Sequence, residues 1–164
     1  MAPQQRAEFI ARYKNGYLQV VEALKGITPD ELDFCPAPNK WSPREIVHHL
    51  ADSEMTSAIR LRKLLVETDA QIQGYDQEEF ARKLHYGKRP IEPALMALQA
   101  ARATTSQLLD LMSEKDWQRT GNHSESGAYS AEKWLEIYAV HAHNHADQIR
   151  RNRKMYHEKS GSRS

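Results

Sequence analysis

Four long segments of the chain carry apolar side chains at spacings of three and four residues, and this periodicity constrains the fold more than any other feature. The first segment runs from about Arg6 to Lys25, and its apolar positions are Phe9, Ile10, Tyr13, Tyr17, Val20, Val21 and Leu24. Such spacing places the apolar side chains on one face of an α-helix. A helix of this kind is stable only when that face packs against other elements.

Glycine and proline mark the boundaries of the first two helices. Gly26 follows the first helix, as a C-terminal glycine does. Residues 28–31 (TPDE) show an N-terminal helix signal but lead only into a short turn, because the segment 35–39 (CPAPN) interrupts the chain. The same signal in Ser42–Glu45 (SPRE) predicts a second long helix that continues to about Glu67.

The second half of the chain predicts two further long helices. Asp76 is a candidate N-cap for a short helix that reaches Leu84. The third long helix is expected to begin at Pro90 and to run to about residue 112. A stretch rich in Gly, Ser and Asn follows at about 118–129, and Ser130 then caps a fourth helix over 131–153.

These segments predict an all-α fold, an antiparallel four-helix bundle, because no segment alternates convincingly as a strand would. We expect one domain over residues 1–153 and a polar, frayed tail over 154–164. Helices of about 20 residues would make the bundle roughly 30 Å long. The 24 or so residues between Glu67 and Ile91 leave two topologies open, a simple up-and-down bundle or one with a crossover connection.

Composition excludes several classes of protein. The 164 residues include 23 Lys and Arg against 22 Asp and Glu, which argues against nucleic acid as a partner. The only cysteine, Cys35, cannot form an internal disulfide, and we expect it to be a buried structural thiol. No run approaches the roughly 20 apolar residues that cross a bilayer, and the N-terminus lacks an apolar signal core, so we expect a cytoplasmic protein.

The eight histidines are the unusual part of the composition. On a helical wheel of the fourth helix, His141 and His145 fall on the apolar side with Trp134, whereas His143 falls on the opposite side. Residues at i and i+4 have Cβ atoms about 5–6 Å apart, so two such imidazoles can bind one metal ion at about 2.0–2.1 Å. Two core histidines satisfied by hydrogen bonds would have the same spacing. The spacing therefore does not decide between a metal site and a hydrogen-bonded core pair.

The second helix offers two adjacent candidates for a third metal ligand. His49 lies beside the apolar stripe of that helix, and His48 lies further round toward solvent. The wheel separates them only weakly, since neither is at the centre of the stripe. We select His49, because a side chain at the edge can point into the space between two helices, where bundles build their metal sites.

Two blocks of residues resemble the DinB/YfiT-like superfamily of metal-binding four-helix bundles. The first is Trp41–Ser53 (WSPREIVHHLADS), continuing through Arg60, and the second is His141–Ile149 (HAHNHADQI). The similarity extends over about residues 8–152 and is closest to the YfiT branch, also called the bacillithiol transferase group. Two positions depart from that branch, which commonly has histidine where Glu54 and Asn144 stand.

The resemblance implies a bundle of antiparallel helices that binds one divalent metal ion, nickel or zinc in different members. It maps three histidine ligands onto His49, His141 and His145. Members are labelled metal-dependent hydrolases or act as S-transferases with a low-molecular-weight thiol as cosubstrate. The resemblance also implies a homodimer and a small-molecule substrate.

Three histidine ligands leave a coordination position open, which is typical of a catalytic metal site. The metal could activate water for hydrolysis or a bound thiol for S-transfer. Four further residues are candidates for orienting ligands or moving protons: Tyr138, Asp52, Glu54 and His123. Their alternative interpretations are a core tyrosine, two solvated helix carboxylates and a surface-loop histidine. Trp41 and Trp134 are expected to be core anchors.

Two non-enzymatic hypotheses remain beside the enzyme. The chain could be a non-catalytic bundle that binds metal or another protein. It could also be a bundle without metal, in which the three histidines belong to the core.

Overall fold

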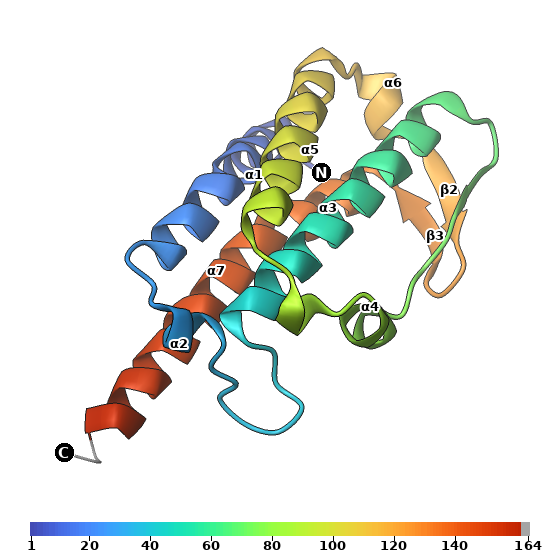
Figure 1. The fold of residues 1–164 in the computed structure, drawn as a ribbon. Coiled ribbons are helices and arrows are strands. Elements are labelled where there is room, and N and C mark those ends of the chain that lie inside the picture. Colours follow the sequence, from blue (N-terminus) through green and yellow to red (C-terminus); the bar gives the residue numbers. More distant parts are fainter. Residues whose placement is uncertain (162–164) are drawn as a thin grey trace.

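Four long helices dominate the computed structural model, which describes residues 1–161 (Figure 1). They are α1 (Pro3–Leu24), α3 (Pro43–Val66), α5 (Glu92–Leu111) and α7 (Ala131–Gly161). The predicted four-helix bundle is therefore confirmed, and the starts and ends of the first three helices agree with the sequence signals to within two or three residues.

The bundle contains two pairs of parallel helices. In the pair α1 and α7, Arg6 near one start bonds Glu132 near the other, and Arg150 bonds Gln19 further along. Helices α3 and α7 run in opposite directions. The Trp134 indole near the start of α7 donates to the carbonyl of Ser57 in the second half of α3, and Asn152 further along α7 donates to the carbonyl of Trp41 just before α3. Each pair is thus antiparallel to the other pair (Figure 1).

Helices α3 and α5 form the second parallel pair. Arg44 near the start of α3 bonds the carbonyl of Arg89, which lies just before α5, and Arg62 bonds Thr105 further along both helices. The connection between these helices therefore returns along the length of the bundle (Figure 1). Of the two topologies that the sequence left open, the structure has the crossover.

Short helices form where the capping signals stand. Helix α2 (Pro29–Leu32) and α3 each begin with a capping box, built by Thr28 and Ser42. Asp76 accepts from two backbone N–H groups at the start of α4 (Gln77–Lys83), as predicted. The 3₁₀ helix η1 (Tyr86–Lys88) and α6 (Glu114–Trp117) complete the helical connections.

The expectation of no strands is wrong, because three short strands form one small sheet. They are β1 (Ala70–Ile72), β2 (Thr120–His123) and β3 (Gly127–Ser130), in the order β1-β2-β3. Strand β2 pairs parallel with β1 and antiparallel with β3. Strands of three or four residues are too short to show alternation in the sequence, and the β1–β2 pairing joins segments about 50 residues apart.

The fourth helix is longer than predicted. Helix α7 continues past Arg153 to Gly161, so residues 154–161 of the predicted frayed tail are helical, and residues 162–164 lie outside the described part of the chain. Arg153 and His157 both contact the carboxylate of Glu31, which is 2% exposed. Packing against α2 therefore stabilises a segment whose composition alone predicts fraying.

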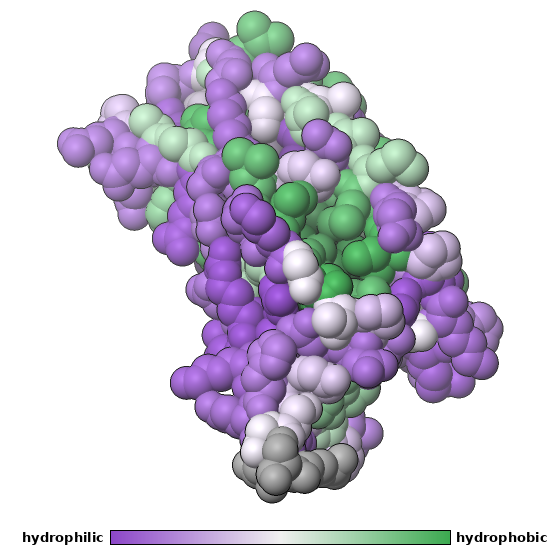
Figure 2. All heavy atoms as spheres, turned by 60° about the vertical axis from the view of Figure 1, so that its left-hand side comes forward, coloured by the Kyte–Doolittle hydropathy of each residue, from purple (hydrophilic) through white to green (hydrophobic). Residues whose placement is uncertain are grey.

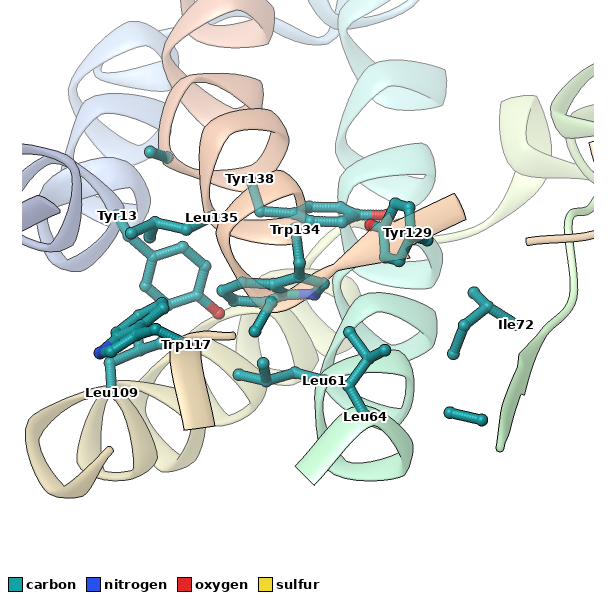
Figure 3. Packing of buried hydrophobic residues seen from close by; sticks show 13 residues of the cluster. Tyr13, Leu61, Leu64, Ile72, Leu109, Trp117, Tyr129, Trp134, Leu135 and Tyr138 are labelled. Atoms are coloured by element: carbon teal, nitrogen blue, oxygen red, sulfur yellow. The ribbon is translucent and has the colours of Figure 1, made fainter. Parts of the chain in front are cut away.

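Two clusters of buried apolar side chains form the core. One surrounds Trp134 and includes Tyr13, Leu61 and Tyr138 (Figure 3). The other lies toward the opposite end of the helices and includes Ile46, Leu50, Ala142, Ala146 and Ile149.

The surface is largely hydrophilic, with an apolar area on the face shown in Figure 2. Exposed apolar side chains on α1 include Leu18 and Val21. Within residues 1–161, none of the helices has the length and apolarity needed to cross a membrane.

Candidate metal centre

Three histidines from two helices converge at one point between α3 and α7. His49 comes from α3, and His141 and His145 come from successive turns of α7. One nitrogen of each lies within 4.8 Å of the others, and the Nε2 atoms of His49 and His141 are 3.3 Å apart. The structure thus brings together the three residues selected from the sequence.

Helix packing explains the convergence. The capping box at Ser42 starts α3 so that His49 lies in its second turn, next to the buried Leu50. On α7, Ala142 and Ala146 are fully buried beside the two histidines. Alanine side chains let the helix backbones approach closely, so the longer imidazoles meet in the space between the helices.

The spacing of the three rings fits a divalent metal ion. Two nitrogens that bind one ion tetrahedrally at about 2.0–2.1 Å are about 3.3–3.4 Å apart, close to the separation of the His49 and His141 Nε2 atoms. The Nδ1 atom of His145 lies 2.8 Å from Oε1 of Gln148, a contact that directs its Nε2 atom toward the other histidines.

Two nitrogens of the cluster lack hydrogen-bond partners. Among the described residues, the buried Nδ1 atoms of His49 and His141 have none. An unpaired buried polar group costs about 1–3 kcal/mol, so hydrogen bonding within the protein does not satisfy this cluster. Because the Nε2 atoms face the centre of the cluster, the Nδ1 atoms stay unpaired with or without a metal, and they do not decide between a metal site and three core histidines.

Burial keeps the three imidazoles neutral near pH 7. Burial and the neighbouring His145 lower the pKa of His49 to about 3. Burial is also the main cause that lowers the pKa of His141, and it lowers that of His145 despite the opposing hydrogen bond with Gln148. Only a neutral imidazole has a free lone pair for a metal.

The histidines open into a pocket of about 300 Å³. Its other lining residues are Asn39, Lys40, Trp41, Gln77, Glu78 and Gln148. The Trp41 ring lies 4.7 Å from the His49 ring, and its indole N–H donates to Glu78 at 3.2 Å. Trp41 is partly buried and packs against the second core cluster, and it also forms part of the pocket wall, whereas Trp134 is fully buried as predicted.

A second pocket of about 460 Å³ adjoins the first across Trp41 and Glu78. It shares Lys40 with the first pocket and adds the charged side chains of Glu45 and Arg82. Cys35 also lines this pocket and is exposed, so the expectation of a buried thiol is wrong. The prolines around Cys35 hold its segment as an irregular loop on the surface.

Tyr138 and Glu54, two of the candidate catalytic residues, lie in the buried interior. The Tyr138 ring is 5.8 Å from the His141 ring, but its hydroxyl accepts a hydrogen bond from Arg60 at 3.1 Å. Glu54 is fully buried and ion-paired with Arg102. Neither residue lines the pocket of about 300 Å³ at the histidines.

Asp52 and His123 also lie away from that pocket. The carboxylate of Asp52 accepts from the Tyr86 hydroxyl at 2.5 Å, a contact that fixes η1 against α3. His123 ends β2, where its ring packs 5.4 Å from that of Tyr129. The four candidate catalytic residues are thus not gathered around the three histidines.

His48 and His143, the two alternatives on the same helices, bond elsewhere. The Nε2 atom of His48 lies 3.1 Å from the carbonyl oxygen of Arg89, and that of His143 lies 2.9 Å from the carbonyl oxygen of Arg12. Both are therefore separate from the cluster.

Sequence reasoning missed the polar lining of the pocket. Glu78 and Gln77 follow the Asp76 cap and reach the pocket only because α4 lies beside α3. Gln148 was recognisable as one turn beyond His145 on the same face of the helix. Lys40 and Asn39 lie in an irregular loop and carry no signal in the sequence.

Known proteins include several with sequences similar to this chain. A sequence model of the DinB superfamily matches residues 14–149. A relative from Oceanobacillus iheyensis, named "Putative metal-dependent hydrolase", is 37% identical over 120 residues, which cover 73% of this chain and 69% of the relative. A Bacillus cereus relative with the same name is 30% identical over 136 residues, covering 83% and 78%.

A similar solved structure has the same fold. It is YfiT from Bacillus subtilis, described as "a probable metal-dependent hydrolase with an unusual four-helix bundle topology". The two structures superpose with a TM-score of 0.88 at 24% sequence identity, over 94% of this chain and 89% of that one.

Proposed function

The chain belongs to the DinB superfamily, and from this membership and the three-histidine cluster we propose that it is a metal-dependent enzyme acting on a small molecule. His49, His141 and His145 would hold one divalent ion, nickel or zinc. The observation that carries the proposal is the convergence of three neutral imidazoles at the wall of an open pocket.

A metal held by three histidines supplies Lewis acidity, which lowers the pKa of a bound water or thiol. Among the described residues, Glu78 is the only carboxylate lining the pocket at the histidines, so it is the candidate to accept a proton from the nucleophile. Trp41 donates to Glu78 and orients its carboxylate. Lys40, Asn39 and Gln148 offer donors that would hold polar groups of the substrate.

Hydrolysis is the reaction that we favour, since the relatives carry that name. Thiol S-transfer is the second candidate. It is supported by the adjoining pocket of about 460 Å³, which has room for the body of a low-molecular-weight thiol whose sulfur would lie at the histidines. In that reaction Glu78 would accept the thiol proton, and the thiolate would displace a leaving group from the electrophile.

Metal content tests the ligand set. Protein purified without a histidine tag should contain about one nickel or zinc ion per chain by elemental analysis. His141→Ala and His145→Ala should each lose most of this metal. His143→Ala is the matched control, because His143 lies between them on the same helix and bonds Arg12 instead. Equal metal content in all three variants would contradict the site.

Turnover tests the reaction. Metal-loaded protein should hydrolyse members of an ester and amide panel, or consume a chromogenic electrophile in the presence of a low-molecular-weight thiol. Glu78→Gln should reduce kcat by about 10²–10⁴-fold if Glu78 takes the proton. Full metal content without turnover in either assay would favour the non-catalytic metal-binding bundle.

The proposal also covers the cellular location, the oligomeric state and nucleic-acid binding. We propose a cytoplasmic homodimer that does not bind nucleic acid. The exposed apolar side chains of α1 suit contact with a second copy. Analytical ultracentrifugation should give twice the chain mass of 18.9 kDa.

A further inference from the structure

Within residues 1–161 three arginines are buried, and one of them has no direct ion pair with a carboxylate. Arg6 is paired with Glu114 and Glu132, and Arg102 with Glu54. Arg60 is 9% exposed, yet no carboxylate within residues 1–161 lies within 4.0 Å of its guanidinium. A buried charge is normally paired, since removing it from water costs several kcal/mol.

The hydrogen bonds of Arg60 go only to neutral groups. Its Nη1 donates to the Tyr138 hydroxyl at 3.1 Å and its Nη2 to the Gln73 carbonyl at 2.6 Å. The guanidinium also lies 5.8 Å from the centre of the Tyr75 ring. These contacts hold the side chain in place without a direct ion pair.

Two buried donors of this region are unused. Neither the Nε–H of Arg60 nor the hydroxyl of Tyr129 has a hydrogen-bond partner among the described residues. Tyr129 comes from β3 and is 4% exposed, and Figure 3 shows it and Tyr138 on the same side of Trp134. A positive charge with two unpaired donors nearby is the chemistry that recognises an oxyanion.

This group lies beside the histidine cluster. Tyr138, which bonds Arg60, is one helical turn before His141, and their rings are 5.8 Å apart. The strand-to-helix segment that supplies Gln73 and Tyr75 continues directly into Gln77 and Glu78, which line the pocket at the histidines.

We propose that Arg60 and Tyr129 form an anion subsite next to the metal centre, which takes a carboxylate group of the substrate. This proposal rests on the proposed function in one respect: the bound carboxylate belongs to a substrate only if the chain is an enzyme. The subsite consists of protein side chains alone, so its affinity for a carboxylate can be measured without metal.

The experiment follows the thermal unfolding of EDTA-treated protein while sodium formate replaces sodium chloride at constant ionic strength. For the parent, Tm should rise saturably by about 3 °C or more, because a ligand that binds only the folded state stabilises it. Arg60→Met should lose the response, and Tyr129→Phe should reduce it. Arg62→Met is the matched control, since Arg62 lies on the same helix and bonds Thr105, and it should respond as the parent does.

Several results would overturn the subsite. One such result is a parent protein whose Tm does not respond to formate. Another is an Arg60→Met variant that responds as the parent does. The third is a response that requires added metal and is lost in His145→Ala. If Arg60→Met does not fold, Tyr129→Phe and Arg60→Lys decide, and an unreduced response in both contradicts the proposal. A formate response in a protein that binds no metal would instead refute the proposed function and leave the subsite standing.

Discussion

Nη1 of Arg102 lies 2.5 Å from Oε2 of Glu54 at the centre of the bundle, and both side chains are almost fully buried. The Tyr13 hydroxyl donates to the other oxygen of Glu54, also at 2.5 Å. The remaining donors of Arg102 reach the carbonyl oxygens of Tyr13 and Tyr138. Glu54 therefore joins α1, α3 and α5, and we assign it a structural role.

Replacing Glu54 with glutamine should destabilise the protein strongly. The substitution leaves Arg102 buried without a counter-charge, a defect that costs about 3–5 kcal/mol. Urea unfolding should report this loss, whereas Glu136→Gln, which removes an exposed pair with Lys133, should change stability by less than about 0.5 kcal/mol. An equal, small effect of both variants would show that Glu54 is not needed for folding.

Gln148 should tune the metal affinity of the cluster through His145. Its Oε1 lies 2.8 Å from the His145 Nδ1 atom and fixes the orientation of that ring. Gln148→Leu should weaken metal binding about 10–100-fold, as the loss of such a contact typically does. Gln148→Glu keeps an acceptor there and should bind metal at least as well as the parent. Competition with a chromogenic chelator measures both, and parent-like affinity of Gln148→Leu would contradict this role.

Acid should destabilise the protein partly through Glu31. Burial by itself raises the pKa of Glu31, but hydrogen bonds from Thr28 and Arg153 outweigh it and lower the pKa to about 2. A carboxylate with a lowered pKa stabilises the folded state above its unfolded pKa of 4.5, and this stabilisation disappears as the pH falls from 4.5 toward 2. Glu31→Gln should therefore be less stable than the parent near pH 6, with a smaller difference near pH 2.

Urea unfolding across this pH range measures the Glu31 contribution. Asp30→Asn is the control, because Asp30 is the exposed neighbour of Glu31 in α2. A constant difference between Glu31→Gln and the parent from pH 6 to pH 2 would rule out the titration.

Gly16 should tolerate no side chain. A Cβ atom there would lie 2.6 Å from Nη2 of Arg102 and 2.9 Å from Cβ of Ala142. Gly16→Ala should therefore displace Arg102 and cost about 1–3 kcal/mol, despite the higher helix propensity of alanine. Gly161→Ala, where no atom of the described residues lies within 4 Å, should be neutral or slightly stabilising. Thermal unfolding compares the two, and equal Tm values would contradict close packing at Gly16.

Local signals in the sequence predicted most of the helical architecture and the residues of the three-histidine cluster. Ser42 and Asp76 cap their helices as expected, since capping depends on residues three or fewer positions away. His141 and His145 share a face because helix geometry alone relates residues four apart. The choice of His49 over His48 was weak on the wheel, and the structure places His49 at the cluster.

Contacts between distant segments decided the rest. The β1–β2 pairing, the crossover of the 67–91 connection and the helical end of α7 each depend on residues tens of positions apart. The same holds for Glu54 and Arg60, two charged residues six positions apart on α3 whose burial the sequence did not predict. Tertiary packing buries both side chains and places Arg102 beside Glu54, whereas no carboxylate of residues 1–161 lies within 4.0 Å of the Arg60 guanidinium. The docking of the helices decides which side chains face each of these residues, and local sequence patterns do not encode that docking.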